Sequence, residues 1–179
     1  MLSIARAERD TPAIRKYAYR FIEHRFDNGY YRIYKSAFPA SEWTKEFERL
    51  LKHYATKSRG FNEYFSENSA ANLLAEEKLS ERLLSMLEEK PSPQAVEHYL
   101  KHFANTFPER TLALFKKAVD IYSAKNVGGH HYDDIAKWLG IIRKLPGGGP
   151  VFTAMLADYR ETYRRRPSMM RILASAFGE

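Results

Sequence analysis

Residues 107–150 read FPERTLALFKKAVDIYSAKNVGGHHYDDIAKWLGIIRKLPGGGP. Proline at the second position suits the first turn of a helix. Behind it, apolar residues recur at helical spacing at Leu112, Phe115, Val119 and Tyr122. An adjoining strip holds Leu114, Ala118 and Ile121. Two apolar strips predict a helix that is buried on two sides, as expected inside a stack of helices.

The second half of this stretch predicts a partner for that helix. Gly128 and Gly129 interrupt the first helix, and apolar spacing resumes at Tyr132, Ile135, Ala136, Trp138, Leu139 and Ile142. Residues 146–150, PGGGP, predict a loop. They lack the lysine and hydroxyl of a phosphate-binding loop, and they follow a helix instead of a strand. Links this short favour antiparallel neighbours.

The same pattern continues over the rest of the chain. Thr11 followed by proline predicts an N-cap, and the stripe behind it is Ile14, Tyr17, Ala18, Phe21 and Ile22. Ser41 predicts another helix start, and Gly60 predicts its C-terminal stop. We expect about ten helices in a single all-α domain over residues 1–179. The expected architecture is an α-α superhelix of stacked antiparallel helix pairs, as in TPR and HEAT repeats.

An internal repeat is predicted for residues 28–88 and 97–165. Phe38–Pro39 matches Phe107–Pro108 at an offset of 69 residues. At an offset of 68, the matches pair Phe47, Leu51, Tyr54 and Lys57 with Phe115, Val119, Tyr122 and Lys125. Any two amphipathic helices align by their period alone, so the shared Phe–Pro step is what favours a repeat.

Composition excludes several classes of function. The 179 residues include no cysteine, which excludes disulfides, thiolate metal sites and cysteine nucleophiles. No apolar run is long enough for a membrane span, and the N-terminus lacks the apolar core of a signal peptide. We therefore expect a cytoplasmic protein with no membrane contact. The net charge of +7 comprises +6 over residues 1–60, −4 over 61–105 and +5 over 106–179, so the basic ends make nucleic acid a candidate partner.

The densest group of metal-ligating residue types is His130, His131 and Asp134. His130 and Asp134 are four residues apart, a helical spacing that can ligate zinc. An ordinary solvated helix start explains the same residues, because acidic side chains favour a helix N-terminus. Further ligands do not stand out nearby, and neither does a Ser/His/Asp series or a facing pair of carboxylates. We therefore predict no metal, no cofactor and no catalytic residue.

Two sets of residues are candidates for an interaction surface. Tyr30, Tyr31 and Tyr34 exceed what one core stripe needs and suit a half-exposed groove, although helix packing explains them equally well. The basic set is Arg160, Arg164, Arg165, Arg166 and Arg171. These arginines can bind phosphate or can stabilise the C-terminal end of the helix before them, and we favour the second role.

Several segments resemble a known family. They include Tyr30-Tyr31-x-x-Tyr34-Lys35, His131-Tyr132-Asp133-Asp134-Ile135-Ala136 and Tyr163-Arg164-Arg165-Arg166-Pro167. Over nearly all of its length, the chain resembles the C-terminal helical region of bacterial SWIM-type zinc-finger proteins and related uncharacterised proteins. The resemblance implies a superhelical scaffold carried beside a zinc module that contacts DNA or protein. Because this chain has no cysteine, zinc binding is not carried over to any residue, and we expect the scaffold portion of a longer protein.

These observations predict a non-enzymatic helical scaffold that mediates protein–protein interaction. A protein partner is therefore expected. The alternative is a nucleic-acid-associated helical domain that uses its basic ends.

Overall fold

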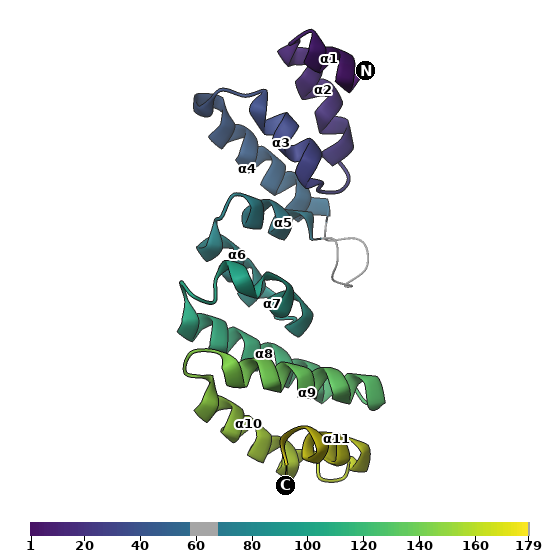
Figure 1. Ribbon diagram of the computed structural model, residues 1–179, viewed down its shortest axis with the longest axis vertical. Helices are drawn as coiled ribbons and strands as arrows, with labels where there is room; N and C mark the ends of the chain where they lie inside the picture. Colours follow the sequence, from purple (N-terminus) through teal and green to yellow (C-terminus); the bar gives the residue numbers. More distant parts are fainter. Residues whose placement is uncertain (58–67, 179) are drawn as a thin grey trace. The chain divides into compact units, whose positions relative to one another are not determined.

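The computed structural model describes residues 1–57 and 68–178, and every regular element in them is helical (Figure 1). Eleven α-helices and one 3-10 turn follow one another, with no strand in this part of the chain. The prediction of an all-α protein is confirmed, with one helix more than the expected ten or so. The predicted stop at Gly60 lies outside the described residues.

Packing divides the chain into two compact units, Met1–Leu79 and Ser80–Glu179. The first holds α1 (Leu2–Ala7), α2 (Thr11–Ile22), α3 (Asn28–Ser36), α4 (Ala40–Lys57) and α5 (Ser69–Glu76). The second holds α6 (Ser80–Glu89), α7 (Pro93–Tyr99), the 3-10 turn η1 (Leu100–His102), α8 (Pro108–Lys125), α9 (Gly129–Lys144), α10 (Gly148–Thr162) and α11 (Pro167–Phe177). A single domain over residues 1–179 stays a prediction.

Helices pack mainly against their neighbours in chain order. In the first unit, α1 packs on α2, α2 on α3, and α4 on α5. In the second unit, α7 packs on α8, α8 on α9 and α9 on α10, while α11 returns to α9 and α6 reaches α8. Adjacent-pair packing is the pattern of a helical-repeat stack, as the sequence predicts.

The two longest described helices, α4 and α8, have 18 residues each. At the predicted offset of 68 residues, both ends of α4 fall on those of α8. Phe47 and Phe115, which match at this offset, are both buried, and so are Leu50 and Ala118. The internal repeat stays a prediction. It requires the matched helices to begin and end at one common offset, as α4 and α8 do.

Three helices of the first unit have an N-cap residue with a short polar side chain. Asp10, Asp27 and Asn68 each accept a hydrogen bond from the backbone N–H three residues on, at 2.9–3.0 Å. Such bonds satisfy N–H groups that have no partner within the helix. The prediction of Thr11 as N-cap is therefore wrong by one residue, because the Asp10 carboxylate already binds the N–H of Ala13.

Two glycines at the start of α10, Gly147 and Gly148, are required by backbone conformation and close packing. Gly147 has φ +73°, a conformation that side chains rarely adopt. A Cβ on Gly148 would lie 1.8 Å from the carbonyl oxygen of Ile142, so only glycine fits there. These two residues allow the chain to leave α9 and start α10 within a few residues.

Candidate functional site

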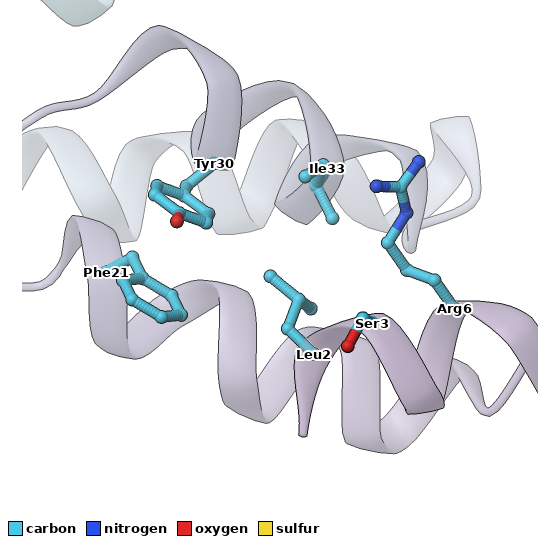
Figure 2. A pocket seen from close by; sticks show the side chains of 6 residues that line it. All are labelled: Leu2, Ser3, Arg6, Phe21, Tyr30 and Ile33. Carbon is cyan, nitrogen blue, oxygen red and sulfur yellow. The ribbon is translucent and has the colours of Figure 1, made fainter.

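A groove opens in the first unit, where α1 and α3 each pack against α2. Side chains from all three helices line it, namely Leu2, Ser3, Arg6, Phe21, Tyr30 and Ile33 (Figure 2). Its volume is about 360 Å³, and the groove is open to solvent. Figure 2 shows Phe21 and Tyr30 on one side, Arg6 beside Ile33 on the other, and Leu2 between them.

An aromatic pair forms one wall of this groove. The rings of Phe21 and Tyr30 stack with centroids 4.1 Å apart and 9° between their planes. Phe21 nevertheless remains 52% exposed. A single exposed apolar residue is ordinary, but this one borders a hollow that Leu2 and Ile33 also line.

Phe21 is exposed because α1 is too short to cover it. The apolar stripe predicted for α2 contains both Phe21 and Ile22, yet Ile22 is fully buried while Phe21 lies at the edge. Helix α1 has six residues and buries only Ala5. Ile4, on the same helix, is 55% exposed. Apolar spacing does not predict α1, because six residues are too few to display an apolar stripe.

Arg6 adds a positive charge to the groove. Its side chain is exposed, and it forms no ion pair with any residue in the described part of the chain. The other polar side chains that line the groove are the hydroxyls of Ser3 and Tyr30, so no lining residue is acidic. The groove therefore combines apolar walls with hydrogen-bond donors and one uncompensated cation.

The predicted tyrosine surface is wrong for two of its three members. Tyr31 and Tyr34 are buried, at 0% and 4% exposure, and only Tyr30 reaches the groove. The Tyr31 hydroxyl donates to Glu77 Oε1 at 2.6 Å, and Lys35 Nζ donates to the same carboxylate. Burial raises the pKa of Tyr31. Tyr31 and Tyr34 therefore pack in the core and do not form an exposed interaction surface.

The carboxylates that these tyrosines bind are held in their charged forms. Burial alone would raise the pKa of Glu77, but the hydrogen bonds from Lys35 and Tyr31 outweigh it and lower that pKa. Glu46 follows the same rule, since bonds from Arg49 and Tyr34 lower its pKa against the effect of burial. Both carboxylates thus tie α3 to a neighbouring segment of the first unit, by charge-assisted hydrogen bonds.

Two of the candidate metal ligands, His130 and His131, contact each other, and His131 also contacts a tyrosine. His131 Nδ1 lies 2.6 Å from the Tyr122 hydroxyl, and the His130 ring lies against that of His131 with centroids 3.8 Å apart. In the described residues, no three His, Asp or Glu side chains form a group that could hold a metal ion. His130, His131 and Asp134 therefore do not form such a group. These residues lie in the first turns of α9, the helix that packs on α8.

Three of the five candidate arginines are engaged within the second unit. Arg166 donates to the Ser123 carbonyl at 2.9 Å, and its guanidinium lies 4.3 Å from the Tyr163 ring centroid. It thus binds the C-terminal end of α8, whereas the sequence analysis favoured the end of α10 just before it. Arg164 pairs with Glu161, and Arg160 donates to the Gly178 carbonyl. Arg165 and Arg171 are exposed and form no ion pair with a described residue.

A buried polar cluster joins α8 to α10, and the sequence analysis missed it. Ser123, fully buried, donates to the Asp120 carbonyl at 3.0 Å, and its oxygen lies 3.1 Å from the Tyr159 hydroxyl. The Tyr159 hydroxyl also donates to Asp120 Oδ1 at 2.7 Å. Among the described residues, the hydrogen-bond partners of the Ser123 hydroxyl are the Asp120 carbonyl and the hydroxyls of Tyr159 and Tyr163, so the cluster satisfies polar groups that are buried between α8 and α10. Serine within an apolar stripe is the only signal that pointed to it.

No family model, no curated protein and no solved structure matches this chain. Within the described residues, no helix combines the length and apolar character needed to cross a membrane.

Proposed function

We propose that this protein is a non-enzymatic helical scaffold that binds a segment of another protein in the groove between α1, α2 and α3. The observation that carries the proposal is Phe21, a large apolar side chain that is half exposed at the edge of a hollow. Leu2 and Ile33 extend the apolar surface across the groove. Aromatic and aliphatic side chains around a recess are typical anchors of protein interfaces.

The energetics favour an occupant with apolar side chains. Fully burying a phenylalanine side chain is worth about 1.5–3 kcal/mol, so covering the exposed half of Phe21 would contribute about 1 kcal/mol. The Phe21–Tyr30 stack is already formed, which lowers the entropy lost on binding. A short amphipathic helix laid into the groove would bury several such contacts at once.

Selection from a displayed random peptide library tests this proposal. The full chain should enrich peptides with a shared apolar pattern. The variant Phe21→Ser should weaken their binding about fivefold, because it removes the exposed anchor that contributes about 1 kcal/mol. Failure to enrich any peptide, or enriched peptides that bind Phe21→Ser as well as the parent, would refute a protein-binding groove.

A matched control is available in the second unit. Val127 is also large, apolar and exposed, at 65%, but it does not line the groove. The variant Val127→Ser removes a similar exposed surface and should leave peptide binding unchanged. Thermal unfolding of both variants checks that the substitutions leave the helices folded.

The alternative function is association with nucleic acid through Arg165 and Arg171, the two candidate arginines whose side chains form neither an ion pair nor a hydrogen bond with a described residue. It would produce affinity for duplex DNA that falls steeply with salt. Replacing either arginine with alanine would reduce the slope of log affinity against log salt concentration by about one. An unshifted DNA band at low salt would remove this alternative.

The cellular setting is also a proposal. A chain without cysteine suits the reducing cytoplasm, where we place this protein. The resemblance to the helical region of SWIM-type zinc-finger proteins supports the scaffold role by analogy. The sequence of the full open reading frame tests it, since a cysteine-bearing zinc module beside this region is what the resemblance requires.

A further inference from the structure

The positive charge of Arg6 specifies the chemical class of the groove's occupant further than the apolar lining does. Several cations of the first unit are neutralised by carboxylates at short range, and the pairs are Arg15–Glu42, Arg32–Glu76 and Lys35–Glu77. Arg6 lines the groove and has no such pair with a described residue. Its guanidinium is thus available to a carboxylate from outside the first unit.

The residues around Arg6 are close to neutral once their ion pairs are counted. Residues 1–36 contain eight Lys or Arg and four Asp or Glu. Two of the four acids, Asp10 and Asp27, already accept backbone N–H groups at the starts of α2 and α3. Three of the eight cations are paired with Glu42, Glu76 and Glu77, so residues 1–36 and these three partners carry eight positive and seven negative charges, a net charge of +1. The positive charge at the groove is therefore that of Arg6, which favours a carboxylate over a cation there.

The shape of the groove favours a peptide over a nucleic acid. Phe21 and Tyr30 cover one face of each other's ring, which leaves less open aromatic surface for stacking a base. The remaining apolar lining, Leu2 and Ile33, is aliphatic and suits packing against side chains. One arginine holds a single carboxylate well but does not follow a chain of phosphates.

We infer that the groove binds an acidic amphipathic segment of a partner protein, with apolar side chains against Phe21 and Ile33 and a carboxylate on Arg6. This inference rests on the proposed scaffold function and adds the chemical class of the partner. A bidentate bond between the guanidinium and this carboxylate favours one register of the segment along α1.

Two fluorescent helical peptides of about 18 residues test this inference by anisotropy titration with the full chain. Both peptides carry the same leucines and phenylalanines on one face. The polar positions hold Glu in one peptide and Lys in the other. The Glu peptide should bind at least about tenfold more tightly than the Lys peptide, and added salt should narrow the difference.

Charge reversal at Arg6 provides the sharper measurement. The variant Arg6→Glu should lose the preference for the Glu peptide and gain one for the Lys peptide. Arg165→Glu makes the same charge change at an exposed position of the second unit, and it should leave the preference intact. Phe21→Ser should weaken both peptides, because the apolar contact is common to them.

The outcomes separate the partner chemistry from the scaffold function. Equal, Phe21-dependent binding of both peptides overturns the acidic partner and leaves the scaffold standing. Binding of neither peptide also overturns it, and the library selection then decides on the scaffold independently. Displacement of the Glu peptide by a single-stranded DNA oligonucleotide of equal charge, or self-association that Phe21→Ser abolishes, would assign the groove to a different occupant.

Discussion

The guanidinium of Arg166, just before α11, donates a hydrogen bond to the backbone carbonyl of Ser123 near the end of α8, 43 residues earlier. The last carbonyls of a helix have no partner within the helix, and they carry its partial negative charge. Arg166 therefore joins the start of the last helix to the end of α8. Its stacking on Tyr163 keeps the side chain in place.

Replacing Arg166 with alanine should destabilise the protein by about 1–2 kcal/mol, because a charged donor to a part-buried carbonyl is lost. Denaturant unfolding measures this change. Arg165→Ala, the neighbouring exposed position, should stay within about 0.5 kcal/mol of the parent. Equal stability of the two variants would show that the α8 contact contributes nothing.

Alanine at Gly148 should destabilise the protein by at least about 2 kcal/mol, because its Cβ would overlap the Ile142 carbonyl oxygen at 1.8 Å. Gly149 is the matched control, since a Cβ there meets nothing within 4 Å and the residue lies within α10. Gly149→Ala should stabilise by about 0.5–1 kcal/mol through helix propensity. Thermal unfolding of both variants tests the opposite signs, and similar shifts would contradict the close approach.

Glu97 supplies the acceptor for a buried indole. Trp138, 1% exposed, donates from Nε1 to Glu97 Oε2 at 2.8 Å. Glu97→Ala should cost about 1–3 kcal/mol, because the indole N–H loses its partner inside the second unit. Glu97→Gln keeps an acceptor and should recover most of that loss in the same unfolding assay. Equal losses in both variants would assign the effect to the carboxylate charge.

Glu77 should make stability depend on pH in the acid range. Its pKa lies below the usual value of 4.5 in the folded protein, so the unfolded chain takes up its proton first as the pH falls. The stabilisation is therefore present above the unfolded pKa and is lost as pH falls through the folded pKa. Glu77→Gln should lower stability at neutral pH and flatten the dependence below about pH 4.5.

Unfolding free energies at a series of pH values measure this effect. Tyr31→Phe removes one of the bonds that lower the pKa of Glu77, so it should flatten the same region by a smaller amount. An acid limb that is identical in the parent and in Glu77→Gln would place the pH dependence in other groups.

The helices of the second unit were accessible to sequence reasoning. The stripe from Tyr132 to Ile142 predicted α9, and the glycines before it and Pro146 after it predicted its ends to within about one residue. The prediction of a loop over residues 146–150 is wrong for its last three residues, because α10 begins at Gly148. In α2, the same reasoning placed Phe21 and Ile22 together on the buried face, yet only Ile22 is covered. Periodicity identifies an apolar face but not how far the neighbouring helix extends over it.

The sequence by itself determined that this chain is built from helices and where most of them break, because helix period, proline and glycine act within a few residues. Only the tertiary structure decided that Tyr31 and Tyr34 are buried while Phe21 and Arg6 border a groove. That outcome depends on how α1 and α3 each rest on α2, which is set by contacts between side chains of different helices. Burial and charge pairing are properties of those contacts, and no local pattern encodes them.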